Sequence, residues 1–281
     1  MKFLTLLACA TAMLVASLSA QELKLPALSP TATLTQEFST SKIEIVYSRP
    51  SARGRKVMGE LVPFGEVWRT GANSATKVTF GEDVWVGGKE VKAGTYSLYT
   101  KPTPGEWEVI INKNTGNWGA FGYAVTDDVA RFNVRPTMLH GHDMVETFTI
   151  WISDITYSTC NIKLAWENTE IVIPVKSNNS ERLMASIDKA INTPNIPYQQ
   201  AATYYYETNQ NLETALVYAD KAIEQNPKAF WMYHTKAKIA AKLGKKDVAI
   251  AAANKSIEVA KGGPAEAEYT RNNQKLIDSL K

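Results

Sequence analysis

The chain has 281 residues, a formal net charge of +3, and ordinary contents of hydrophobic (44%) and charged (21%) residues. This length suits two domains with separate cores, since one domain typically takes ~100–200 residues. The small net charge argues against nucleic acid as a partner, because such a partner requires lysines and arginines concentrated on one face.

Residues 1–20 have the composition of a signal peptide: Lys2, then an apolar run, then small residues ahead of Gln21. The run is short for a bilayer span, and no later stretch reaches the ~18 apolar residues that a spanning helix needs. We therefore expect an exported protein, periplasmic or extracellular, with no transmembrane segment in the mature chain. Residues 21–41 are expected to form a lead segment before the first domain.

Residues 42–176 alternate apolar and polar side chains in short segments that Gly, Pro, Asn and Asp separate. A period of two is typical of half-buried strands. The segment 85–91 contains Gly87-Gly88, a two-residue turn that predicts a hairpin. Many strands without intervening helices predict an antiparallel, jelly-roll-like β-sandwich. Cys160 lies on one of these strands, where we expect a small buried hydrophobe and no disulfide or reactive thiol.

Residues 177–281 change to a period of about 3.6, which predicts a helical domain. Its first helix is expected to end at Thr193-Pro194. A set of small residues then recurs after about 34 residues, the period of tetratricopeptide repeats. The set is Ala215, Ala219 and Ala222, followed by Ala249, Ala253 and Ser256. Because Tyr233, Lys236 and Ala237 depart from the repeat pattern, we predict about two degenerate tetratricopeptide-like repeats plus a terminal helix, forming a docking surface for a partner protein.

Two strings in the predicted sandwich, VWRTGAN at residues 67–73 and AGTYSLYT at residues 93–100, are long and particular. With their surroundings, from about residue 28 to 175, they closely resemble the domain of unknown function family 2911 (DUF2911), found in exported bacterial proteins. The resemblance implies no established activity, substrate or catalytic residue. Functional candidates therefore come from the residues themselves.

The long irregular segment 47–80 is the first candidate, because such connections within a domain are usually functional. Guanidinium groups bind carboxylate, sulfate or phosphate through paired N–H donors. We predict an anion-binding surface here if the arginines converge at one water-accessible place. The candidate ligand residues are Arg49, Arg53, Arg69 and Asn73, with Arg55 and Lys56 nearby. The alternative is that these arginines pair with internal acids such as Glu60, Glu66 or Asp127.

A second candidate is Trp118, which lies with Phe121 in a glycine- and asparagine-rich loop that suits a sugar-binding face. Core packing is the alternative for these rings. The pair His140 and His142, followed by Asp143, is a weak metal-ligand pattern without a third ligand, so we expect exposed turn histidines. No metal site and no cofactor is predicted.

No known catalytic motif occurs in the sequence, and we predict no catalytic residue. The leading hypothesis is a non-enzymatic binding module with an anion- or glycan-facing β domain and a protein-docking helical tail. One alternative is a hydrolase that acts on an envelope polymer through a carboxylate pair. Its acids would come from Glu60, Glu66, Asp127, Asp128 and Glu146. A third possibility is a structural role, in which the sandwich only holds the helices for assembly.

Overall fold

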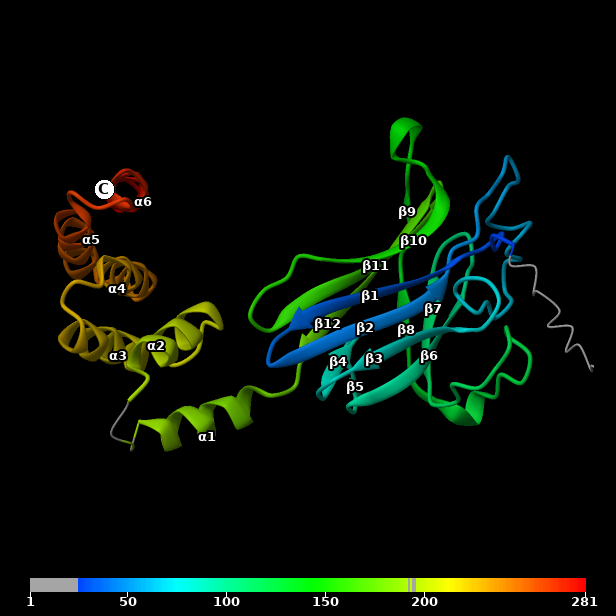
Figure 1. Ribbon diagram of the computed structural model, residues 1–281, viewed down its shortest axis with the longest axis horizontal. Coiled ribbons are helices and arrows are strands. Elements are labelled where there is room, and N and C mark those ends of the chain that lie inside the picture. The colour runs from blue at the N-terminus through cyan, green and yellow to red at the C-terminus, as the bar shows by residue number, and fades with distance from the viewer. Residues whose placement is uncertain (1–24, 192, 194–195) are drawn as a thin grey trace, which may run out of the picture.

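The computed structural model describes residues 25–191, 193 and 196–281. The proposed signal peptide, residues 1–20, and Pro194, at which we expect the first helix to stop, lie outside the described residues. Two antiparallel sheets form the N-terminal part, and six helices follow them (Figure 1). The predicted class, mainly β plus α with an antiparallel sandwich, is therefore confirmed.

The first sheet has the strand order β1-β2-β3-β6-β7-β8. Its strands are β1 (Thr31–Phe38), β2 (Ser41–Ser48), β3 (Thr76–Phe80), β6 (Gly94–Lys101), β7 (Trp107–Asn112) and β8 (Asp128–Val134). Strand β1 lies within the segment 21–41 that we set apart as a lead, and it pairs with β2 along its whole length. Its outward face is polar, so only one side of the strand contributes to the core.

The second sheet has the order β10-β11-β12-β4-β5, with β9 pairing with β12. Its strands are β10 (Val145–Ser153), β11 (Thr159–Glu167), β12 (Thr169–Ser177), β4 (Val84–Val86), β5 (Lys89–Val91) and β9 (Thr137–Met138). The β4–β5 hairpin turns at Gly87 and Gly88, both with positive φ, so the predicted glycine turn is confirmed. Cys160 is buried on β11, as expected for a small core hydrophobe.

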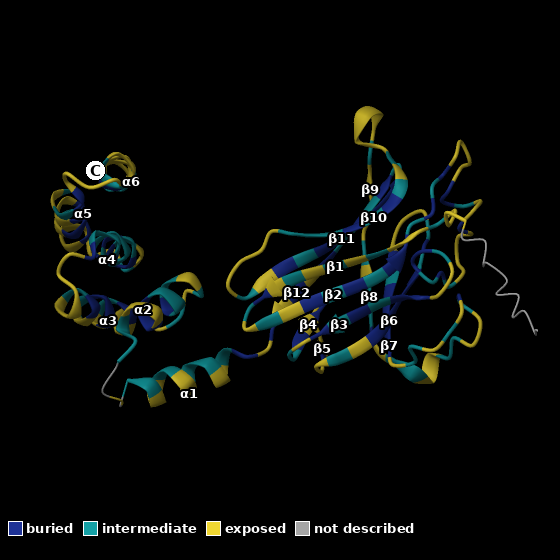
Figure 2. Ribbon diagram, viewed as in Figure 1, coloured by how far each residue is buried: buried dark blue, intermediate teal, exposed yellow. Residues whose placement is uncertain are grey.

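The core lies between the two sheets, whose inward faces are almost fully buried (Figure 2). At one end, Trp68 enters this core from the long β2–β3 connection. Its ring lies 5.2 Å from Phe148 of β10, 5.9 Å from Trp166 of β11 and 6.4 Å from Trp107 of β7. One side chain from an irregular segment thus contacts strands of both sheets, which fixes that segment on the open end of the sandwich.

The helices are α1 (Ser180–Ala190), α2 (Tyr198–Glu207), α3 (Leu212–Gln225), α4 (Phe230–Lys242), α5 (Lys246–Ala260) and α6 (Glu266–Ser279). The recurring small residues of α3 and α5 are buried, which lets neighbouring helices approach closely. Among the described residues, no helix is long and apolar enough to cross a membrane.

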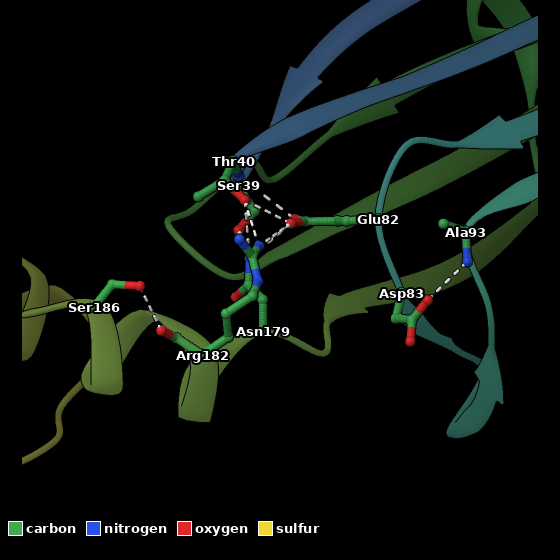
Figure 3. A network of polar contacts seen from close by, with 8 residues as sticks. All are labelled: Ser39, Thr40, Glu82, Asp83, Ala93, Asn179, Arg182 and Ser186. Carbon is green, nitrogen blue, oxygen red and sulfur yellow. Dashed lines mark hydrogen bonds and ion pairs between the residues drawn. The ribbon is translucent and has the colours of Figure 1, made fainter.

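The sandwich is joined to α1 by a group of polar contacts around Glu82, which lies in the β3–β4 turn (Figure 3). One carboxylate oxygen of Glu82 accepts hydrogen bonds from Thr40 Oγ1 at 2.6 Å, Asn179 Nδ2 at 2.8 Å and Arg182 Nη2 at 3.2 Å. Asn179 is buried and also donates to Ser39 Oγ at 2.9 Å. The first turn of α1 is therefore held against the β1–β2 and β3–β4 turns.

Candidate functional site

The β2–β3 connection, residues 49–75, lies over one end of the sandwich and forms a pocket of about 350 Å³ that we call the Trp68 pocket. Isolated bridges from Ser51 to Thr147 and from Trp68 to Thr100 tie the connection to both sheets. The pocket is lined by Ser29, Pro50, Arg55, Leu61, Val62, Pro63, Glu66, Val67, Trp68, Arg69, Gly71, Ala72 and Trp166. Most of these residues are apolar, but the surface that faces the cavity is more polar than apolar, and three of the side chains are ionised.

Trp68 fixes the geometry of this pocket. Its backbone N–H donates to the Thr100 carbonyl at 2.7 Å and its carbonyl accepts from the Thr100 N–H at 3.0 Å. The indole Nε1 donates to the Gly71 carbonyl at 3.0 Å, and the ring stacks on Trp166 at an interplanar angle of 22°. Because backbone and ring are both held, the residues on either side of Trp68 have little freedom of position.

Arg69 lines the pocket with a half-buried side chain whose donors find no acceptor among the described residues. Its Nε atom is fully buried and has no hydrogen-bond partner in the described part of the chain. The ion pairs among the described residues all involve other cations. The alternative in which Arg69 pairs with Glu60, Glu66 or Asp127 is therefore not found among these residues. A buried, unsatisfied N–H is unfavourable by about 1–3 kcal/mol, and native proteins contain few of them.

The backbone beside Arg69 adopts an unusual conformation. Thr70 has φ of 54°, in the left-handed region that β-branched residues rarely enter. It is held there by buried contacts: its Oγ1 lies 3.1 Å from Thr100 Oγ1, and its carbonyl accepts from Thr76 Oγ1 at 2.5 Å. Strain of about 1–3 kcal/mol at such a residue persists only where the surroundings impose it, and it is common at ligand sites.

The structure distributes the other arginines of this segment over different contacts. Arg49 is directed toward β10, where Nε donates to the Phe148 carbonyl at 3.1 Å and Nη2 donates to Thr149 Oγ1 at 2.8 Å. Arg53 donates to the Leu28 carbonyl at 3.1 Å. Neither residue lines the Trp68 pocket, whereas Arg55 does. Of the predicted ligand arginines Arg49, Arg53 and Arg69, only Arg69 lines the pocket, so the expected convergence of these three side chains does not occur. The sequence could not show this, because the partners of Arg49 lie about 100 residues away.

Asn73 and Trp118 line a second pocket, also of about 350 Å³. Asn73 Nδ2 donates to the Ser29 carbonyl at 3.3 Å and to Ser48 Oγ at 3.2 Å. The Trp118 side chain is 66% exposed, so core packing does not explain it. Gly119, the residue after Trp118, lies close to Arg69, since an added Cβ there would be 3.1 Å from Arg69 Nη1. The Trp118 loop therefore packs beside the Arg69 guanidinium.

From the sequence, Glu66 is a candidate internal partner for arginine and one of the candidate acids of a hydrolase, but not a ligand-binding residue. In the structure Glu66 lines the Trp68 pocket, and no hydrogen bond or ion pair joins its carboxylate to another described residue. Trp166 of β11 was likewise not singled out, although it forms the floor on which Trp68 stacks. The available signal was the spacing of Glu66 and Arg69 on either side of Trp68, within an irregular segment.

The remaining sequence candidates lie outside this site. His140 and His142 are exposed at the short helix Gly141–Asp143, as expected for turn residues. Within the described ranges, no group of three or more His, Cys, Asp or Glu side chains is arranged to hold a metal ion. Burial raises the pKa of the Cys160 thiol to about 12, so this cysteine is protonated at neutral pH.

Residues 29–175, which include the Trp68 pocket, match the family model described as "Protein of unknown function (DUF2911)". No curated protein and no solved structure matches the chain.

Proposed function

The chain belongs to the DUF2911 family, and we propose that it is an exported bacterial envelope protein that binds a small anionic ligand in the Trp68 pocket without transforming it. The signal-like composition of residues 1–20 supports export to the periplasm or the cell exterior. The family description assigns no activity, so the side chains of the pocket carry the proposal.

The observation that carries it is the Arg69 guanidinium. It lines a pocket in which most residues are apolar, and its N–H groups have no acceptor within the described ranges. A guanidinium presents paired donors to carboxylate, sulfate or phosphate. An anion in the pocket would also supply the negative charge that no acid of the described residues places against Arg69. Arg55 adds a second cation whose orientation is set, since Nε donates to the Ala52 carbonyl and Nη2 to the Ser51 carbonyl, both at 2.8 Å.

The hydrolase alternative requires two acids that face each other, usually within ~5–10 Å. Glu66 is the one carboxylate among the residues that line the Trp68 pocket. The other acids considered have partners elsewhere: Glu60 pairs with Lys56, Asp127 with Lys113 and Asp128 with Arg131, and Glu146 accepts from the Arg53 N–H. These contacts favour binding over hydrolysis as the function of this pocket.

Asn73 and Trp118 are included in the proposal as an extension of the ligand surface. The exposed indole and the side-chain amide suit a sugar ring, and Gly119, next to Trp118, lies beside Arg69 of the Trp68 pocket. An anionic ligand that carries a sugar group would contact both pockets.

We propose that the helical tail, α1 to α6, is a tetratricopeptide-like stack that docks a partner protein. Burial of Ala215, Ala219, Ala249 and Ala253 supports the repeat, because these are the positions at which its helices must approach closely. The polar contacts around Glu82 would then hold the docking surface and the ligand pocket in one assembly.

The test is a titration of the full chain with small anions. Isothermal calorimetry with acetate, benzoate, sulfate and phosphate should detect saturable binding of at least one of them. Arg69→Ala should weaken that binding about tenfold or more, since hydrogen bonds to charged groups contribute about 1.5–3 kcal/mol. Arg69→Lys should restore little of it, because the paired donors are lost.

Arg135→Ala is the matched control, since Arg135 is highly exposed, lies outside the pocket and pairs with Glu106. It should bind like the wild type. Equal affinities in the wild type and in Arg69→Ala for every anion that binds would contradict the proposal, as would the absence of binding by all four.

A further inference from the structure

The Trp68 pocket contains an acid as well as two cations, and the acid and Arg69 are both unpaired. Glu66 and Arg69 lie on either side of Trp68 and line the same cavity. They are not within ion-pair distance of each other, and neither has a side-chain partner among the described residues. An acid and a guanidinium on one mobile segment would be free to pair, but here the anchored Trp68 separates them.

The fixed position of Trp68 keeps Glu66 and Arg69 apart. Trp68 is held by its two backbone hydrogen bonds with Thr100 and by its stacking on Trp166. Thr70, which follows Arg69, is fixed by its contact with Thr100 Oγ1. Since the chain on the Arg69 side cannot relax easily, the two charges are presented separately to the cavity. Groups that are already positioned bind a ligand without a further cost in ordering.

The uncharged residues of the lining are apolar except for Ser29 and Gly71, although more polar than apolar surface faces the cavity. Pro50, Leu61, Pro63, Val67 and Ala72 surround the charged groups, and the cavity volume is about 350 Å³. Pockets of a few hundred Å³ with apolar walls and a few placed polar groups are typical sites for small molecules. A ligand that matches this lining has an apolar body, one anionic group and one cationic group.

We propose that the ligand of the Trp68 pocket is a zwitterionic amino acid with an apolar side chain. Its carboxylate contacts the guanidinium groups of Arg69 and Arg55, and its ammonium group donates to the Glu66 carboxylate. The side chain contacts the apolar wall near Leu61 and Val67. This inference rests on the proposed anion-binding function and adds Glu66 as the residue that distinguishes a zwitterion from a simple anion.

The experiment compares three related probes by calorimetry with the full chain at neutral pH. Leucine carries both charged groups, N-acetyl-leucine lacks the ammonium group, and leucinamide lacks the carboxylate. We expect leucine to bind about tenfold or more tightly than N-acetyl-leucine, because one hydrogen-bonded charge contact is lost in the latter. Leucinamide should bind weakest, since both guanidinium groups then lack their partner.

Glu66→Gln tests the role of the acid directly. It should remove the preference for leucine over N-acetyl-leucine while leaving N-acetyl-leucine binding unchanged or stronger. Glu60→Gln is the matched control, because Glu60 lies in the same connection, is exposed, and does not line the pocket. It should retain the wild-type preference.

The outcomes separate the two proposals. If leucine and N-acetyl-leucine bind equally and their binding still depends on Arg69, the zwitterion proposal is wrong but the proposed anion-binding function is supported. Retention of the preference in Glu66→Gln would overturn the assignment of Glu66. Failure of leucine and N-acetyl-leucine to bind at millimolar concentrations would overturn the zwitterion, and the anion titration would then decide the proposed function by itself.

Discussion

Trp68 and Thr100 exchange both of their backbone hydrogen bonds, at 2.7 and 3.0 Å, although 32 positions separate them in the chain. This contact joins the string VWRTGAN to the string AGTYSLYT, so the two segments that carry the family resemblance meet at the pocket. It also places Thr100 Oγ1 3.1 Å from Thr70 Oγ1 in a site without solvent access. Thr100 therefore contacts the residues on both sides of Arg69, which are Trp68 and Thr70.

Thr100→Val should reduce the free energy of unfolding by about 0.5–1.5 kcal/mol, because it removes the hydrogen bond between two buried hydroxyls while Thr70 Oγ1 keeps its 3.4 Å contact with the Trp68 carbonyl. Urea unfolding followed by tryptophan fluorescence measures this change. Thr95→Val is the control: the Thr95–Thr79 hydroxyl pair has a similar distance, 2.9 Å, but is exposed. It should change the stability by less than about 0.5 kcal/mol. Equal losses in the two variants would contradict the role assigned to the buried pair.

Gly119→Ala should weaken anion binding in addition to lowering stability. Gly119 has φ of 73°, and an alanine Cβ would lie 3.1 Å from Arg69 Nη1, so the guanidinium would have to move. Gly88→Ala is the control, since Gly88 has φ of 77° and a Cβ there meets no atom within 4 Å. Both variants should lose about 1–2 kcal/mol for the left-handed conformation. Calorimetric titration should show weaker binding only in Gly119→Ala, and wild-type affinity there would refute the contact.

Glu82→Ala should loosen the attachment of α1 to the sandwich. It removes the acceptor that Thr40, Asn179 and Arg182 share (Figure 3). The Glu82 side chain is only 10% exposed, so water replaces this acceptor poorly. Hydrogen exchange of the amides in the first turns of α1 should become about tenfold faster or more, since local opening there loses charged hydrogen bonds.

Glu258→Ala is the control for this variant, because the Glu258 carboxylate pairs with Lys255 on the exposed surface of α5. Exchange in α1 should stay at the wild-type rate. If Glu82→Ala left α1 equally protected, the polar contacts around Glu82 would not be what holds the two parts together.

His234 should make the helical tail less stable in acid. Burial lowers the pKa of His234 below its ordinary value of 6.5, and the hydrogen bond with Asn273, in which Nδ1 and Oδ1 are 2.7 Å apart, opposes this effect only in part. Below pH 6.5 the unfolded chain therefore takes up the proton before the folded chain does. The contribution is fully present above pH 6.5 and is lost as the pH falls toward the lower pKa of the folded state.

The measurement is the free energy of unfolding of the full chain, or hydrogen exchange in α4 and α6, across this pH range. His234→Gln keeps a polar side chain but cannot titrate, so the difference between wild type and variant isolates the histidine. We expect the wild type to lose stability relative to His234→Gln as the medium is acidified. A difference that does not change with pH would rule out this titration as the cause.

The sequence alone determined the class of the fold. Alternation with a period of two identified the buried strands, and Gly87-Gly88 identified a hairpin, because both signals depend only on neighbours along the chain. The buried alanines of α3 and α5 were predicted in the same way. Strand β1 was not, since the segment 31–38 is mostly polar and gains its place in the sheet by hydrogen bonding to β2.

Only the tertiary structure decided which charged residues line the Trp68 pocket. Arg49 and Arg69 are equivalent as sequence candidates, but the first donates to β10 about 100 residues away, while the second finds no acceptor within the described ranges. Glu66 enters the site because the stacking of Trp68 on Trp166 of β11 fixes the segment around it. Contacts between residues far apart in the chain determine which of several chemically similar side chains line the pocket. Local sequence patterns do not reveal these contacts.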